Sequence, residues 1–121
     1  MRERNGVQRN ICVFVNPSSG KKQAERLFGD RLQPMLELCG FQYEKITSPH
    51  SAYFEELLNE LDGLDMENPK MKQFLGFTDI VFIGGDGFAF LFNFHLYQHP
   101  RLYELFKEKA YGYMPGGTYC G

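Results

Sequence analysis

The spacing of apolar residues along the chain predicts an alternation of strands and helices. The apolar run at 10–15, "NICVFV", predicts a buried strand that ends at an Asn-Pro turn. From 21 to 39, apolar residues recur every three or four positions, which is the spacing of one helical face. Pro34 removes a backbone donor and should kink or restart this helix, and Gly40 should end it.

The middle of the chain has weaker patterns. The segment 41–47, "FQYEKIT", alternates loosely between apolar and polar residues and predicts a second strand at an edge of the sheet. Ser48-Pro49 predicts the start of a second helix, because proline is favoured at the first helical position. Residues 63–76 have no period and contain two helix breakers, which predicts a loop, with room for a helical turn at 71–75. A third, apolar strand is predicted at 78–85.

The phenylalanine-rich segment at 88–97 is apolar on every side, so its period does not separate helix from strand. We expect a buried helix, because a further strand here would place an antiparallel hairpin inside an α/β pattern. With a short strand at 111–114, the pattern predicts a three-layer α/β domain, with a mostly parallel sheet and helices on both faces. We also expect the isolated chain to expose an apolar patch within 88–94 and to associate through it.

Composition and charge narrow the function classes. The chain has 121 residues, 43% of them hydrophobic and 23% charged, which suits one domain at 10–121 after an N-terminal tail at 1–9. A net charge of −2, without a long basic run, argues against nucleic acid as the partner. The three cysteines form no CxxC pair, which favours a reducing, cytoplasmic setting. No apolar run approaches the ~20 residues of a membrane span, so we expect lipid to be met from the aqueous side, at the membrane periphery.

Three glycine-containing loops follow predicted strands and carry the candidate chemistry. In "GGDG" at 84–87, the glycines can adopt positive φ and leave no Cβ in the way of a phosphate bound by backbone N–H groups. Asp86 can accept a proton from an attacking hydroxyl or hold a magnesium ion. The loops "NPSSGKK" at 16–22 and "MPGGT" at 114–118 offer similar donors. A hairpin turn or a capped turn would explain any one loop, but three loops at the same sheet edge indicate an anion site.

The motifs "NPSSGKK", "TDIVFIGGDG" and "YMPGGT", in this order, resemble the catalytic domain of the diacylglycerol kinase and sphingosine kinase family of lipid kinases. The resemblance implies a nucleotide domain of the lipid-kinase and NAD-kinase kind, with ATP and Mg²⁺ as cofactors. The implied reaction is phosphorylation of a lipid alcohol (a sphingoid base, a ceramide or a diacylglycerol), with Asp86 taking the proton of its hydroxyl. The residues implied to bind the nucleotide are Asn16, Ser18, Ser19, Gly20, Lys21, Thr47, Gly84, Gly85, Gly87, Gly117 and Thr118.

The sequence departs from the family pattern at positions that bear on activity. Leu91 stands where glutamate is common, Phe88 where threonine or leucine is usual, and Tyr119-Cys120 where Gly-Asn is expected. Family members continue into a β-rich domain that takes part in binding the lipid. We therefore expect the domain to be incomplete at its C-terminal end and inactive alone, with the lipid and the membrane surface reached through the missing half. The alternatives are a non-catalytic nucleotide-binding or interaction domain and a NAD kinase, which the "NPSSGKK" loop disfavours.

Overall fold

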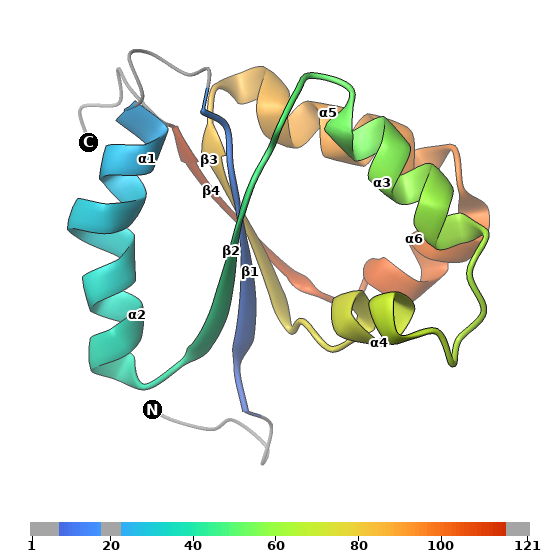
Figure 1. The fold of residues 1–121 in the computed structure, drawn as a ribbon, viewed down its shortest axis with the longest axis horizontal. Coiled ribbons are helices and arrows are strands. Elements are labelled where there is room, and N and C mark those ends of the chain that lie inside the picture. The colour runs from blue at the N-terminus through green and yellow to red at the C-terminus, as the bar shows by residue number, and fades with distance from the viewer. Residues whose placement is uncertain (1–7, 18–22, 116–121) are drawn as a thin grey trace.

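The computed structural model describes residues 8–17 and 23–115, with Asp86 and Pro115 described by their backbone alone. Within these ranges a parallel sheet of four strands has the order β2-β1-β3-β4 (Figure 1). The strands are β1 (Asn10–Val15), β2 (Gln42–Thr47), β3 (Asp79–Gly84) and β4 (Ala110–Pro115). Because all four run in the same direction, their carboxyl ends lie along one edge of the sheet.

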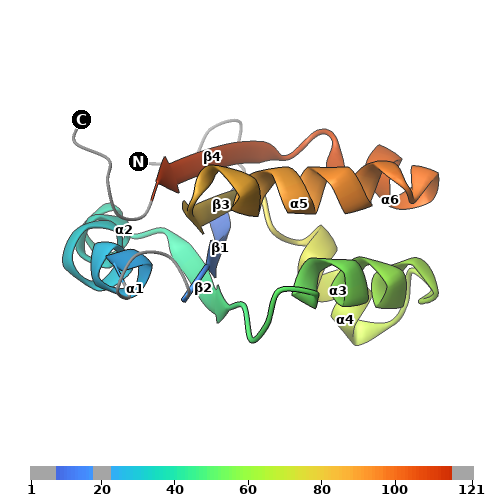
Figure 2. The ribbon, with the colours of Figure 1, turned by 90° about the horizontal axis from the view of Figure 1, so that it is seen from above.

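Helices cover both faces of the sheet, as Figures 1 and 2 show. One face carries α1 (Gln23–Leu27), η1 (Phe28–Leu32) and α2 (Gln33–Cys39). The other face carries α3 (Tyr53–Asp62), α4 (Pro69–Leu75), α5 (Asp86–Tyr97) and α6 (Pro100–Phe106). The three-layer α/β fold predicted from the sequence is confirmed. None of the helices in the described ranges has the length and apolar character needed to cross a membrane.

Strand β1 lies inside the sheet, between β2 and β3. Five of its six residues are buried, and it pairs with β2 on one side and with β3 on the other. Four of the six residues of β2 are exposed and none is buried, and the strand lies at the predicted edge of the sheet. After β2 the chain crosses to the far side of β1 to form β3, so the direction of strand addition reverses between β1 and β3. In open α/β sheets, ligands bind outside the carboxyl ends of the strands at such a reversal.

The first helical segment passes Pro34 without ending. Its central turn, η1, is a π-helix in which the N–H of Gln33 donates to the carbonyl of Phe28, five residues earlier. Proline has no N–H and its ring crowds the carbonyl four residues before it, and the wider turn just ahead of Pro34 accommodates both effects. The segment continues as α2 and ends at Gly40, whose φ of 74° is left-handed, as the sequence predicted.

Three helix starts differ from the sequence-based prediction, and all involve proline. The helix predicted after β2 is present as α3, but it begins only at Tyr53, so the predicted start at Ser48-Pro49 is wrong. The Ser48 hydroxyl donates to the carbonyl of His50 (3.0 Å) within a local turn. The loop expected at 63–76 contains α4, whose cap is Asn68, with Oδ1 accepting from the N–H of Lys70 at 2.9 Å. Helix α6, which was not expected, also starts with a proline.

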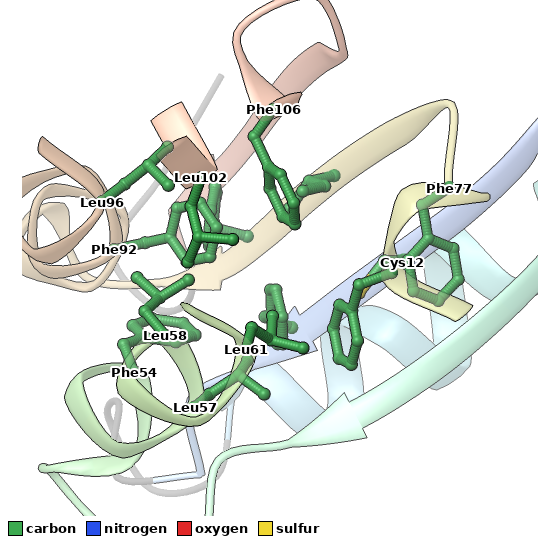
Figure 3. Packing of buried hydrophobic residues seen from close by; sticks show 14 of the residues in the cluster. Cys12, Phe54, Leu57, Leu58, Leu61, Phe77, Phe92, Leu96, Leu102 and Phe106 are labelled. Atoms are coloured by element: carbon green, nitrogen blue, oxygen red, sulfur yellow. The ribbon is translucent and has the colours of Figure 1, made fainter. Parts of the chain in front are cut away.

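The two faces of β1 build two separate cores. Its residues 11, 13 and 15 pack against α1, η1 and α2, whereas Cys12 and Phe14 pack against the helices of the other face. Figure 3 shows Phe92 and Leu96 of α5 pointing into this second core beside Phe54, Leu58 and Leu61 of α3. The helix predicted at 88–97 is therefore confirmed.

The opposite side of α5 is uncovered within the described structure. Phe90 is 64% exposed and Phe94 48%, and their rings stack at 6.0 Å, whereas Phe88 and Phe92 are buried. The apolar patch expected within 88–94 is thus formed by Phe90 and Phe94 and is extended along the helix by Tyr97.

The amino edge of the sheet is closed by an ion pair. Asp79, the first residue of β3, is only 7% exposed. Its Oδ1 accepts from Nε of Arg9 at 3.0 Å, and its other carboxylate oxygen pairs with the same guanidinium. Two parallel hydrogen bonds of this kind fix the geometry of both side chains. The pair ties the residue before β1 to the start of β3, far from the carboxyl edge.

Candidate functional site

A pocket of about 430 Å³ lies at the carboxyl edge of the sheet, where β1 and β3 end. Three segments surround it: the residues that follow β1, the connection from β2 to α3, and the first turns of α5 with Phe54 of α3. Its lining residues are Asn16, Pro17, Ser48, Pro49, His50, Ser51, Phe54, Gly85, Gly87, Phe88, Phe90 and Leu91. The pocket therefore combines a largely apolar wall with a few polar groups, which is typical of small-molecule sites of this size.

Gly84 brings two of these segments together. The N–H of Asn16 donates to the carbonyl of Ile83 at 2.9 Å, which ties the end of β1 to the end of β3. A Cβ built on Gly84 would lie 2.7 Å from the Cβ of Asn16 and 3.1 Å from the Phe88 ring. Real Cβ atoms essentially never approach so closely, so only glycine fits here. Gly84 is thus required by close packing of the two loops.

Gly85 and Gly87 have a different role in the same motif. Gly85 precedes α5 with φ −72° and ψ 172°, and no side chain caps the helix. Among the described residues Gly40 is the glycine with positive φ, so the positive φ expected within "GGDG" is not found. A Cβ on Gly85 or Gly87 would meet nothing within 4 Å, so both positions are open on the pocket side. The first N–H groups of a helix have no partner within the helix. Those of α5, which has twelve residues, lie beside the pocket at the positive end of the helix dipole.

The connection from β2 to α3 supplies pocket residues that the sequence analysis did not select. The N–H of Ser48 donates to the carbonyl of Val15 (2.9 Å), and this bond carries the pairing of β1 and β2 one residue further. Ser48 is 7% exposed, and the next residues turn over the pocket. Nε2 of His50 lies 3.2 Å from Oε1 of Glu56 in α3. The available signal was a Ser-Pro-His-Ser stretch directly after a strand, which had been assigned to a helix.

Thr47 is not among the residues that line the pocket. It is the last residue of β2, and its hydroxyl donates to Oε2 of Glu25 in α1 at 3.2 Å. Glu25 also forms an ion pair with Lys45 at 2.6 Å. These contacts hold Thr47 against the helix on the opposite face of the sheet from α5.

The structure locates part of the predicted site. It brings Asn16, Gly85 and Gly87 to one pocket, with Gly84 packed against Asn16 and Phe88. Asp86 is the first residue of α5, between two pocket-lining glycines. Within the described residues, no group of three or more His, Cys, Asp or Glu side chains is arranged to hold a metal ion. The predicted residues that lie outside the described ranges are Ser18, Ser19, Gly20, Lys21, Gly117 and Thr118.

Leu91 occupies the position at which the family pattern commonly has glutamate. It lies on α5 and lines the pocket, with 37% of its surface exposed. With Phe54, Phe88 and Phe90 it makes this side of the pocket apolar.

Comparison with known proteins matches residues 10–119 to the family model described as the diacylglycerol kinase catalytic domain. Sphingosine kinase 1 of Arabidopsis thaliana is 28% identical over 82 residues, which is 68% of this chain and 15% of the relative. Human ceramide kinase is 28% identical over 79 residues, or 65% of this chain and 13% of the relative. Human ceramide kinase-like protein is 26% identical over 96 residues, covering 67% of this chain and 17% of the relative. The chain thus spans a small part of the length of these relatives.

Proposed function

Because the chain belongs to the family of the diacylglycerol kinase catalytic domain, we propose that it is the nucleotide-binding part of a lipid kinase. The reaction is transfer of the γ-phosphate of ATP to the hydroxyl of a lipid alcohol. The observation that carries the proposal is the "GGDG" loop, which leads from β3 into α5 and lines a pocket at the point of strand reversal. The acceptor classes that fit the relatives' names are sphingoid bases and ceramides, with diacylglycerols as the third candidate.

The phosphates would bind at the start of α5. Backbone N–H groups at a helix start attract anions, and Gly85 and Gly87 present no side chain to hold a phosphate away from them. Asn16 follows β1 and lines the same pocket, where it would contact the nucleotide. Mg²⁺ would accompany the phosphates and neutralise part of their charge. The loop at 18–21 and the pair Gly117 and Thr118 are further nucleotide contacts in this proposal. Thr47 is not among them, because its hydroxyl donates to Glu25 on the opposite face of the sheet from α5.

Asp86 would act as the general base. Its carboxylate accepts the proton of the lipid hydroxyl, while the hydroxyl oxygen forms a bond to the γ-phosphorus. The bond from that phosphorus to the bridging oxygen breaks, and ADP leaves with both bonding electrons. The support for this role is the place of Asp86 at the first position of α5, between the two open glycines.

The nucleoside would occupy the rest of the pocket. Phe54, Phe88 and Leu91 provide apolar surface suited to a planar base, and Ser48 and His50 provide polar groups for its edge or for the ribose. This arrangement accounts for the apolar lining of a site that also has to bind a highly charged group.

The proposal is tested with the natural protein that carries this domain. Phosphate transfer from labelled ATP is measured with sphingosine, ceramide, diacylglycerol and NAD as separate acceptors, and ATP binding is measured in parallel. We expect at least one lipid to be phosphorylated, and we expect Asp86→Asn to abolish transfer while ATP still binds. As a matched control, Asp30→Asn changes an exposed carboxylate in η1 and should leave transfer unchanged. Lipid phosphorylation by the Asp86→Asn variant would refute the assigned role, and transfer to NAD alone would reassign the protein.

A second candidate function is a nucleotide-binding domain without catalysis. The observation that favours it is Leu91, an apolar side chain in the pocket wall where the family pattern commonly has a carboxylate. The same assay separates the two functions, because this candidate requires ATP binding with no transfer to any acceptor.

A further inference from the structure

Phe88 lies at the boundary between the pocket and the core, and we propose that its ring sets the size of base that the nucleotide site accepts. The inference rests on the function proposed above and adds to it the residue that selects among nucleotides. Phe88 lines the pocket although only 6% of its surface is exposed. A small part of the ring therefore forms pocket wall, while the remainder is packed inside the protein.

The packing around Phe88 holds the ring in one position. Its Cδ2 lies 3.1 Å from the position of a Cβ on Gly84, so the ring rests directly against the glycine backbone. The Phe54 ring lies 4.9 Å away between centroids, and the Phe82 ring lies 6.1 Å away at 88°. Close-packed interiors leave little room for a second rotamer. A ligand that enters the pocket thus meets a rigid aromatic wall.

The rigid ring connects the apolar part of the pocket with its phosphate-binding part. Phe88 follows Gly87 directly, and its N–H donates to the carbonyl of Gly85 at 3.0 Å. If the phosphates of a nucleotide are bound at these glycines, the distance from them to the base is set by the nucleotide itself. The distance available to its base is then limited by the side chain at position 88. A smaller side chain there should admit a larger base without altering the phosphate contacts.

Phe92 provides a matched control one turn further along α5. Its ring is 1% exposed and lies 5.3 Å from the Phe54 ring and 5.2 Å from the Phe82 ring, which are also the neighbours of Phe88. Phe92 is not one of the described residues that line the pocket. Figure 3 shows it within the core beside Leu58. Shortening Phe92 removes a comparable buried ring, whereas shortening Phe88 also enlarges the pocket.

The experiment compares dissociation constants for ATP and for two analogues with an enlarged base, carrying a benzyl group at N6 or a phenyl group at C8. The proteins are the natural protein that carries this domain and its variants Phe88→Leu, Phe88→Ala and Phe92→Leu, with circular dichroism to confirm folding. For the Phe88 variants we expect the affinity ratio to shift about tenfold or more towards at least one analogue, since pocket space of one or two methylene groups has effects of this size. For Phe92→Leu the ratio should stay unchanged.

Each outcome decides the proposal. A folded Phe88→Leu chain that binds ATP with an unchanged preference overturns it, as does an equal shift in Phe92→Leu, which would indicate general loosening of the core. Should Phe88→Ala fail to fold, Phe88→Leu carries the test because it keeps an apolar side chain. If the natural protein binds no nucleotide, the proposed function itself fails, and this result is visible before any variant is compared.

Discussion

Replacing Gly87 by alanine should make the protein more stable and its nucleotide site weaker. Gly87 is the second residue of α5, and a Cβ at this position meets nothing within 4 Å. Alanine restricts the unfolded chain and favours the helix, which should raise the free energy of unfolding by about 0.5–1 kcal/mol. The added methyl group would project into the space where a phosphate approaches the helix start. Loss of one hydrogen bond to a charged group costs about 1.5–3 kcal/mol, so ATP affinity should fall at least about tenfold.

The same substitution at Gly84 should have the opposite effect on stability. Its Cβ would lie 2.7 Å from the Cβ of Asn16 and 3.1–3.2 Å from ring atoms of Phe88. Both neighbours are held in place, Asn16 by its hydrogen bond to Ile83 and Phe88 by the aromatic core. Forcing a methyl group into such a space typically costs about 1–3 kcal/mol. Two glycines three residues apart are thus expected to change stability in opposite directions.

Urea denaturation followed by circular dichroism measures the stability change, and titration with ATP measures the affinity. With a slope of about 1–3 kcal/mol per molar urea, Gly84→Ala should lower the midpoint by about 1 M. Gly87→Ala should raise the urea midpoint by a few tenths of about 1 M. Gly29→Ala, at an exposed position of η1 with open space around it, controls for a general effect of glycine replacement. A Gly87→Ala chain that binds ATP as tightly as the unmodified chain would refute the assignment of the phosphate site.

Contacts elsewhere in the molecule lead to four further expectations. Asp79→Asn removes the charged partner of Arg9 and should lower the free energy of unfolding by about 1–3 kcal/mol in urea. Asn68→Ala removes the cap of α4 and should cost about 1 kcal/mol in the same assay. Burial raises the pKa of Tyr111 to about 12 from 10.0, so the folded chain retains its phenolic proton more tightly than the unfolded chain. The resulting stability is fully present below pH 10 and is lost as the pH rises towards about 12. Tyr111→Phe should therefore weaken the loss of thermal stability between these two pH values. Phe94→Gln should reduce the fluorescence of the hydrophobic dye ANS bound to the chain, because it removes an exposed ring.

Exposed residues of the same types serve as controls. Asp30→Asn and Asn59→Ala change side chains at the surface and should leave the urea midpoint near that of the unmodified chain. Leu38, 88% exposed on α2, lies on the opposite face of the sheet, and Leu38→Gln should lower dye binding less than Phe94→Gln does. Equal effects of both substitutions would contradict the assignment of the apolar patch to α5. An alkaline unfolding profile that Tyr111→Phe leaves unchanged would contradict the raised pKa.

The strongest sequence patterns predicted the elements correctly because a single physical requirement produced each pattern. The apolar run at 10–15 had to be buried on both sides, and it forms the central strand. The segment at 88–97 had no decisive period, and its helix was inferred from the topology of the surrounding strands. Its two sides differ in burial because the sheet, α3 and α6 cover one of them, which a local pattern cannot show.

Prolines were less informative about where helices start, because tertiary contacts decide which capping residue and proline begin a helix. Ser48-Pro49 and Asn68-Pro69 both combine a capping residue with a proline, yet only the second pair starts a helix. The N–H of Ser48 is taken by Val15 of β1, which prolongs the sheet by one residue and delays the helix. The N–H of Asn68 donates instead to the carbonyl of Asp65 in the preceding turn, and its side chain caps α4 directly. The distinction depends on a residue 33 positions away in the sequence, so local preference could not resolve it.

The glycine motif was assigned to the correct edge of the sheet, but the physical reason for its first glycine was not foreseen. Gly84 is required because Asn16, 68 positions earlier in the chain, approaches its backbone. A contact over such a sequence separation leaves no local signature. Positive φ, which the sequence suggested for this motif, is found instead at Gly40, where α2 ends. The four pocket residues at 48–51 were missed for a related reason, since their role depends on the strand that precedes them.

The position of the pocket follows from the order of the strands more than from any single residue. Helix α1, which follows β1 in the chain, lies on one face of the sheet, and α5, which follows β3, lies on the other face (Figure 1). In open α/β sheets a crevice forms at such a reversal, and here the pocket lies at the carboxyl ends of β1 and β3, which are adjacent in the sheet. Loops that flank such a crevice can bind a ligand from both sides, and their glycines allow the backbone to approach it closely. A sequence that places glycine motifs after β1 and β3 therefore specifies the location of the site, and the side chains around Phe88 and Leu91 then define the shape of ligand that it accepts.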